Sequence, residues 1–140
     1  MRHLVLAAAF ATLLSGGVER TACAQSAPPR DPRSATMLVG TWRSGGFAYQ
    51  FKRDGSYVYV GTMGTPAMRT QISEEGTYAL SGDQLIVKRR SGLITNTNNY
   101  RQPLNPETTV FHWRLENSPS GPALQLVFPN NGGTQRFYRQ

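Results

Sequence analysis

The stretch VGTWRSGGFAYQFKRDGSYVYVG, residues 39–61, decides the fold class of this chain. Aromatic and apolar residues alternate with polar ones on both sides of Asp54-Gly55, and this period of two is typical of β-strands with one buried face. An Asp-Gly pair between two such runs is a hairpin signal. We therefore expect one strand over residues 40–52, bent at residues 44–46, and a second over residues 56–62.

Two registers of this hairpin are open. With a three-residue loop whose Gly55 is left-handed, Phe51 lies opposite Tyr57. Tyr49 then lies opposite Tyr59, and all these aromatic side chains point inward. A two-residue turn would instead leave both tyrosines of the second strand in water and bring valines inside. We prefer the first register because it buries far more apolar area.

The rest of the chain continues the period of two, and no window of ten or more residues carries a helical stripe. Residues 36–39 could form one short helical turn. The expected strands are residues 40–52, 56–62, 68–80, 84–90, 93–98, 108–116, 123–128 and 134–139, with a bulge at residues 74–76. Short connections force neighbouring strands to pair antiparallel, and closure removes exposed edges. The predicted fold is all-β: an eight-stranded antiparallel up-and-down β-barrel without a long helix.

The N-terminal residues have the pattern of a signal peptide. A basic start precedes an apolar run over residues 4–14, which is too short to span a bilayer as a helix. The small-x-small pattern at Ala22-Cys23-Ala24 predicts cleavage before Gln25. In a competing interpretation the chain is a lipoprotein cleaved before Cys23, although Arg20 stands where an aliphatic residue is preferred. We expect a signal peptide at 1–24, a flexible Pro-rich tether at 25–35 and the barrel domain at 36–140, secreted to a bacterial periplasm.

Little in the sequence indicates catalysis. Cleavage would remove the single cysteine, and His112 would be the remaining histidine, expected to point outward between Phe111 and Trp113. No metal site, cofactor or nucleophilic triad is therefore predicted. Glu74 and Glu75 are adjacent on a strand and are expected to be solvated. Proton transfer by a buried Tyr or Glu is the one enzymatic alternative left open.

The chain has a formal net charge of +7. Such a charge would attract anionic partners such as envelope lipids or acidic polysaccharide. We prefer the simpler interpretation of a soluble basic protein, because the arginines are spread along the chain. Nucleic-acid binding is not expected because the aromatics alternate into the barrel. The polar outward positions argue against a membrane-spanning barrel, and we expect a monomer.

Four motifs together resemble a known family. They are a Gly-x-Trp opening the first strand, an F-x-x-D-G-x-Y hairpin, a G-T-Y-x-L-x-G-D-x-L hairpin and a closing F-Y-R. Over residues 38–139 the chain is similar to the lipocalin-like (calycin) barrels, most closely to small secreted bacterial lipocalin-like domains. The resemblance implies that Gly40 and Trp42 plug a closed end and that Arg139 stacks on the Trp, with Arg136 as a second candidate. Classical members are longer and carry a C-terminal helix, so a chain this short can fill its barrel with its own side chains.

Strand parity then assigns loops to the end opposite Trp42. We expect residues 53–55, 81–83, 99–107 and 129–133 at this open end, of which residues 99–107 form the longest loop. The predicted ligand-binding residues are Tyr49, Phe51, Tyr57, Tyr59, Asn99, Tyr100, Arg101 and Trp113. The first hypothesis is a non-enzymatic module that binds a small polar or amphipathic molecule. The alternative is a protein-interaction module, such as a barrel-type envelope protease inhibitor acting through residues 25–34. A cavity at the mouth would favour the first, and a filled barrel the second.

Overall fold

The computed structural model describes residues 36–140, so the predicted signal peptide and tether lie outside the described residues. Residues 36–38 form one helical turn, close to the turn predicted over residues 36–39. The strands that follow are β1 (Gly40–Ser44), β2 (Phe47–Phe51), β3 (Ser56–Thr65), β4 (Met68–Ser81), β5 (Gln84–Asn96), β6 (Arg101–Pro103), β7 (Glu107–Ser118), β8 (Gly121–Val127) and β9 (Thr134–Arg139). In residues 36–140 no helix is long and apolar enough to cross a membrane.

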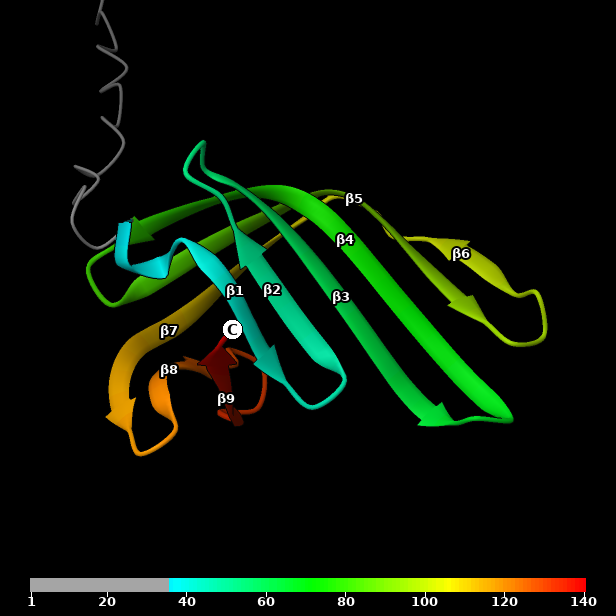
Figure 1. The fold of residues 1–140 in the computed structure, drawn as a ribbon. Helices are drawn as coiled ribbons and strands as arrows, with labels where there is room; N and C mark the ends of the chain where they lie inside the picture. Colours follow the sequence, from blue (N-terminus) through cyan, green and yellow to red (C-terminus); the bar gives the residue numbers. More distant parts are fainter. Residues whose placement is uncertain (1–35) are drawn as a thin grey trace, which may run out of the picture.

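The strands form a closed antiparallel barrel (Figure 1). Their order is β4-β3-β2-β1-β9-β8-β7-β5, and pairing of β4 with β5 closes the ring. The ninth strand, β6, is short and adds to β5 beyond the ring. The predicted eight-stranded up-and-down barrel is thus confirmed. Such a closed antiparallel ring is consistent with a calycin-like fold.

Local turn chemistry sets the register of the two predicted hairpins. Phe51 pairs with Tyr57 and Tyr49 with Tyr59, and Gly55 has φ +82°, so the three-residue loop is confirmed. The second hairpin turns at residues 82–83. A bulge also occurs at the predicted place, because the register of β4 against β5 shifts between Glu75 and Gly76. Its extra residue, however, lies on β5 and not on the predicted strand.

The prediction of a single bent strand over residues 40–52 is wrong. Gly45 and Gly46 form a tight turn, and β2 runs back along β1 with Trp42 opposite Tyr49. Gly45 adopts φ +56°, which glycine reaches without strain. A Cβ on Gly46 would lie 2.3 Å from the carbonyl oxygen of Thr62, so glycine is also needed for the close approach to β3.

Two further predictions about strands are wrong. Residues 91–92 do not form a turn, because β5 continues through them to Asn96. Arg89 pairs with Gly76 and Ser91 with Glu75, so that Arg90 is the extra residue of a bulge. Residues 99–107 are not one long loop, because they contain β6. The ladder with β5 satisfies backbone groups that a loop would leave to water.

These changes correct the assignment of loops to ends. The start of β1 shares its end with the turns at residues 52–55, 81–84 and 118–121. We call this the Trp42 end. The opposite end, the mouth, carries the turns at residues 45–46, 65–68, 96–101 and 128–133 (Figure 1). The prediction that residues 53–55 and 81–83 lie at the end opposite Trp42 is therefore wrong, because the unpredicted reversal at residues 45–46 inverts the direction of the strands that follow it.

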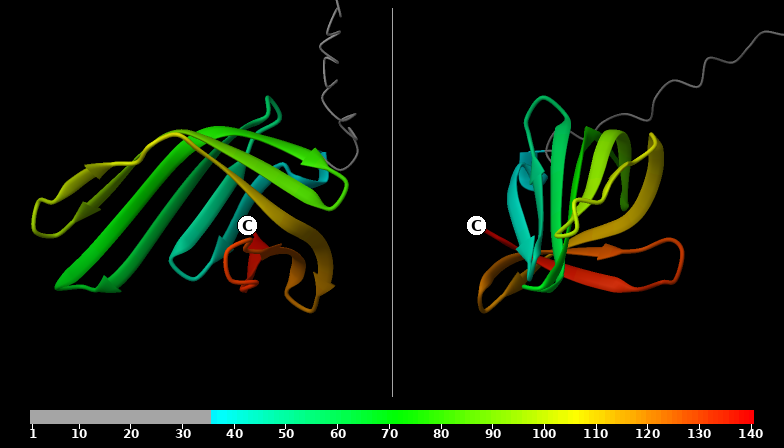
Figure 2. Two further views of the ribbon diagram at one scale, coloured as in Figure 1. Left: turned by 180° about the vertical axis from the view of Figure 1, so that it is seen from behind. Right: turned by 90° about the vertical axis from the view of Figure 1, so that its right-hand side faces the viewer.

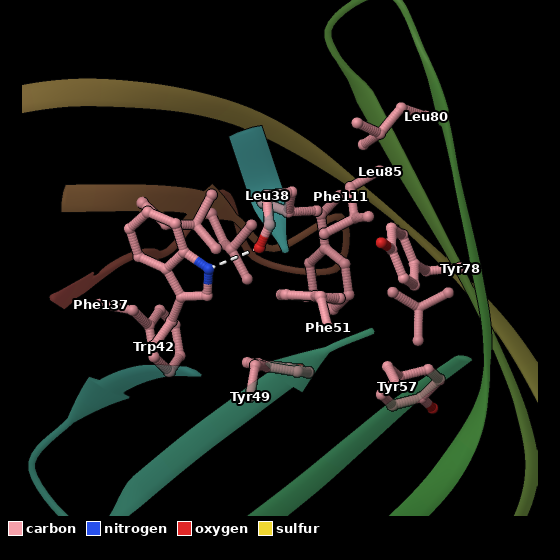
Figure 3. Packing of buried hydrophobic residues seen from close by; sticks show 13 residues of the cluster. Leu38, Trp42, Tyr49, Phe51, Tyr57, Tyr78, Leu80, Leu85, Phe111 and Phe137 are labelled. Carbon is pink, nitrogen blue, oxygen red and sulfur yellow. Dashed lines mark hydrogen bonds between the residues drawn. The ribbon is translucent and has the colours of Figure 1, made fainter. Parts of the chain in front are cut away.

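Large side chains fill the barrel interior (Figure 3). The core cluster comprises Leu38, Trp42, Tyr49, Phe51, Tyr57, Tyr78, Leu80, Leu85, Val87, Phe111, Leu124, Leu126 and Phe137. Its rings pack closely: the Tyr49 ring centroid lies 5.4 Å from that of Phe51 and 5.3 Å from that of Phe137. This dense interior is the dominant source of stability.

Beyond the mouth the sheet continues outside the barrel (Figure 2). The pairing of β2 with β3 ends at Gly61, whereas β3, β4, β5 and β6 remain paired beyond it. We call residues 62–73 and 93–103 the extension. One face of it is continuous with the inner face of the barrel, because side chains alternate along each strand.

Candidate functional site

Ladder register brings charged groups to the inner face of the mouth. Tyr57 pairs with Gly76, Gly76 with Arg89, and Arg89 with Glu107. Directly paired residues of antiparallel strands share a face, so these four positions form one row across β3, β4, β5 and β7. Gly76 carries no side chain, and a Cβ there would lie 1.9 Å from the carbonyl oxygen of Lys88. The next row holds Tyr59 opposite Glu74.

Arg89 is the centre of this group. Its Nη1 lies 2.9 Å from Glu74 Oε1, its Nη2 lies 2.6 Å from Glu107 Oε2, and its Nε donates to the carbonyl of Asn105 at 2.8 Å. The side chains of Arg89 and Glu74 are 16% and 18% exposed, whereas that of Glu107 is 60% exposed. Arg89 therefore has one enclosed carboxylate partner and one that faces water.

The tyrosines beside this ion pair are held in their neutral form. The Tyr57 hydroxyl is buried and has no hydrogen-bond partner among residues 36–140. Burial raises the pKa of Tyr57 well above its ordinary value, the charge of Glu74 raises this pKa further, and Arg89 acts in the opposite direction. Burial, assisted by Glu74, raises the pKa of Tyr59 to about 12. Burial is also the main cause of a raised pKa at Tyr49.

An apolar strip follows the charged rows along the extension. Ile72 and Ile94 form the next row, and Met63 lies one row further out on the same face. Leu104 lies beside Gly92, which precedes Ile94 by two residues on β5: a Cβ on Gly92 would lie 3.0 Å from Leu104 Cδ1. Leu104 therefore borders the strip where it meets the charged rows. Ile72, Ile94 and Leu104 are half-buried, so part of this apolar surface is open to solvent.

The predicted ligand-binding residues are divided between several places. Tyr49, Phe51 and Tyr57 belong to the packed core (Figure 3). Tyr59 is half-buried and packs against this core. The Trp113 indole donates to the Gly82 carbonyl at 3.2 Å, at the Trp42 end. Trp113 therefore lies at the end of the barrel opposite to Arg89.

The other three predicted residues lie at the tip of the β5–β6 hairpin. Asn99 has φ +60°, and Tyr100 and Arg101 are exposed beside it. The Tyr100 hydroxyl donates to Gln102 Oε1 at 2.6 Å, and its backbone N–H donates to Asn96 Oδ1 at 3.0 Å. These residues form a surface tip and not a common site with the barrel tyrosines.

At the Trp42 end, the three residues of the predicted plug are in contact. Trp42 is fully buried and its indole N–H donates to the Leu38 carbonyl at 2.8 Å. The Arg139 guanidinium lies 5.3 Å from the Trp42 ring centroid and donates to the Val39 carbonyl. A Cβ on Gly40 would lie 3.3 Å from this guanidinium, which is a tight contact, and Gly40 has φ +138°, a conformation that favours glycine.

The sequence-based prediction that both glutamates are solvated is wrong for Glu74. Glu75 does point outward and accepts a hydrogen bond from Ser91 Oγ at 2.9 Å. Glu74 instead points inward to Arg89. Sequence reasoning missed Arg89 and Glu107 as well. Because Tyr59 pairs with Glu74, the alternation of side chains on β3 could have identified Glu74 as an inward residue. Arg89 could not be identified in this way, because the bulge at Arg90 interrupts the alternation of inward and outward side chains along β5.

His112 is exposed and its Nδ1 lies 2.9 Å from Asp83 Oδ2, on the outer surface. Over residues 36–140 no group of three or more His, Cys, Asp or Glu side chains is placed to hold a metal ion.

Comparison of the chain with protein-family models, with curated proteins and with solved structures gave no match.

Proposed function

We propose that this chain is a secreted, non-enzymatic binding module of the lipocalin-like type that holds a small amphipathic carboxylate at the mouth of its barrel. The observation that carries the proposal is the unequal pairing of Arg89. Glu74 is an enclosed partner, and Glu107 is a solvent-facing one. Secretion to a bacterial periplasm is part of the proposal and depends on residues 1–24.

A ligand carboxylate can replace Glu107 on Arg89 Nη2. Glu107 is 60% exposed and can turn into water, where its charge is fully solvated. The exchange leaves the number of charges around Arg89 unchanged and retains a charge-assisted hydrogen bond. Tyr57 lies on the same row, two strands from Arg89, and its hydroxyl is buried without a partner among residues 36–140, so an acceptor that reached it would gain a hydrogen bond.

The apolar part of the ligand would lie outside the barrel. The core cluster occupies the interior, where its aromatic rings pack against one another. We therefore place the alkyl chain outside the barrel. The strip of Ile72, Ile94 and Leu104 begins beside the charged rows and runs outward along the extension. A tail lying on this strip would bury apolar surface that is now partly hydrated.

The test is calorimetric titration of the full chain with dodecanoate, with dodecyltrimethylammonium as the ligand of equal tail and opposite head charge. Arg89→Gln should weaken dodecanoate binding on the order of tenfold to hundredfold, the loss of one charged hydrogen bond. Arg90→Gln removes the same charge from the neighbouring exposed residue and should change affinity little. Glu107→Gln should strengthen binding, because it removes the competing carboxylate.

Several outcomes would reject this function. Equal binding of both detergents would mean that the head group is not recognised. Equal losses in Arg89→Gln and Arg90→Gln would indicate general charge attraction. Weaker binding in Glu107→Gln would mean that Glu107 holds the ligand and does not compete with it.

A protein-interaction module, such as a barrel-type envelope protease inhibitor, is the second candidate. The filled interior favours it, because such a module needs no cavity. Its predicted trunk, residues 25–34, lies outside the described residues. Inhibition of a metalloprotease or a serine protease by the full chain, in a chromogenic peptide assay, would support this candidate. Dodecanoate binding without inhibition would support the first.

A further inference from the structure

Two hairpin tips lie side by side at the far end of the extension. They connect β3 to β4 at residues 65–68 and β5 to β6 at residues 96–101 (Figures 1 and 2). The Thr97 backbone N–H donates to the Arg69 carbonyl at 3.1 Å, and Thr97 Oγ1 donates to the Ala67 carbonyl at 3.1 Å. The two tips and the strand residues next to them, 63–69 and 95–101, therefore form one surface, which we call the tip surface, away from the packed core.

The tip surface exposes apolar side chains. Met68 is 70% exposed, Met63 is 43% exposed and Tyr100 is 49% exposed. Pro66 and Ala67, which form the turn between β3 and β4, are exposed as well. Large apolar side chains held in water without packing are unfavourable, and a cluster of them indicates an interaction surface.

The charges of the extension are of one sign. Arg69 and Arg101 are the only charged residues among residues 62–73 and 93–103, and both are exposed. Each lines an open hollow: one of about 450 Å³ beside Arg101 and one of about 200 Å³ beside Arg69. Thr95 and Asn96 line both hollows and add hydroxyl and amide groups. Cations beside such donors suit phosphate groups.

Size and charge together favour a lipid surface over a protein partner. A specific protein interface covers roughly 800 Å² on each partner, and three large apolar side chains at two hairpin tips supply only a small part of that. Insertion into the head-group region of a bilayer requires only a few apolar side chains, with cations beside them to pair with anionic lipids. The chain as a whole has a net charge of +7, which adds attraction at longer range.

We propose that the tip surface docks end-on on an anionic bilayer. Met63 and Met68, on one face of the sheet, enter the head-group region, while Arg69 and Arg101, on the opposite face, pair with lipid phosphates. This inference does not rest on the proposed carboxylate ligand. The two are compatible, because the mouth and the tip surface lie at the same end of the barrel.

The first test is co-sedimentation of the full chain with large unilamellar vesicles, of phosphatidylcholine alone or of equal parts phosphatidylcholine and phosphatidylglycerol. The Arg69→Gln/Arg101→Gln variant should bind the anionic vesicles about 25-fold more weakly, at about 5-fold per arginine. Arg43→Gln/Arg53→Gln makes the same change in net charge at exposed residues outside the extension and should have little effect. Met63→Ser/Met68→Ser should weaken binding by about tenfold or more.

Equal losses in the two arginine variants would overturn the proposal, since net charge alone would then explain binding. Undiminished binding by the methionine variant would do the same. So would equal binding to both kinds of vesicle. Because the variants all retain residues 4–14, any contribution of that apolar run is common to them.

The second test uses the methionines as internal reporters. The chain has four, namely Met1, Met37, Met63 and Met68. With methyl-labelled methionine and anionic vesicles that contain a doxyl-labelled lipid, the NMR signals of Met63 and Met68 should broaden. Met37 is 54% exposed at the Trp42 end and should not broaden. Broadening of the Met1 signal alone, or of the Met37 signal as much as the Met68 signal, would place the bilayer contact elsewhere and refute docking through the tip surface.

Discussion

Replacing Tyr57 by Phe should make this protein more stable. Tyr57 is 1% exposed and packs in the core, and its hydroxyl has no hydrogen-bond partner among residues 36–140. The substitution keeps the ring and removes only that hydroxyl. A buried hydroxyl that exchanges water for no partner is unfavourable by about 1–3 kcal/mol. We therefore expect Tyr57→Phe to raise the free energy of unfolding by about 1–2 kcal/mol.

Tyr78 provides the matched control. It is 7% exposed, and its hydroxyl donates to the Lys52 carbonyl at 2.8 Å. Tyr78→Phe removes the same atom but breaks a hydrogen bond, and this should lower the free energy of unfolding by about 0.5–1.5 kcal/mol. The two substitutions are chemically identical, so the expected difference in sign comes only from the hydrogen-bond partner.

The assay is urea unfolding of the full chain at pH 7 and 25 °C, followed by far-ultraviolet circular dichroism, with the transition midpoint compared at constant slope. A fall in stability of Tyr57→Phe equal to that of Tyr78→Phe would refute the reasoning. It would mean that the Tyr57 hydroxyl is satisfied in solution. Dodecanoate titration of Tyr57→Phe would then show whether that hydroxyl also contributes to ligand binding.

Three other predictions concern the same barrel. Trp42→Ala should lower the free energy of unfolding by about 3–5 kcal/mol, because Trp42 is fully buried; a loss below about 1 kcal/mol in a denaturant melt would contradict its role as a packed plug. Arg89→Gln leaves Glu74 enclosed and unpaired and should lower the free energy of unfolding by about 1–3 kcal/mol. The double variant Glu74→Gln/Arg89→Gln should recover at least half of this loss. A loss in the double variant equal to the sum of the two single losses would argue against coupling between the residues. The unfolded-state pKa of Tyr59 is 10.0 and its folded-state pKa is about 12, so the contribution of this difference to the free energy of unfolding is complete below pH 10 and is lost as the pH rises towards 12. Between pH 9 and 11.5 the urea midpoint should therefore fall less steeply with pH in Tyr59→Phe than in the unmodified protein. An equal fall in both proteins would refute the raised pKa.

The sequence predicts most of the barrel because its signals are local. Alternation along residues 47–60 requires a strand with one buried face, and Gly55 permits the loop that aligns Phe51 with Tyr57. The pairing of successive short strands then follows from chain connectivity.

Other features were not predictable from local sequence. A Gly-Gly pair is compatible with a bend or a reversal, and the choice at Gly45-Gly46 depends on β2 packing back against β1 and β3. The continuity of β5 through residues 91–92 depends on its ladder with β4. In both cases the local conformation is permitted by glycine and is selected by partners distant in the chain.

In the candidate site, too, some features follow from the local sequence and others only from the tertiary structure. The sequence alone determined that tyrosines line the inner face of β2 and β3, because a period of two fixes which side chains share a face. Only the tertiary structure decided that Glu74, Arg89 and Glu107 meet beside them. Their meeting requires the pairing of three strands, β4, β5 and β7, and a bulge at Arg90 that inverts the phase of β5. The free energies of those pairings depend on the whole barrel and not on any single segment.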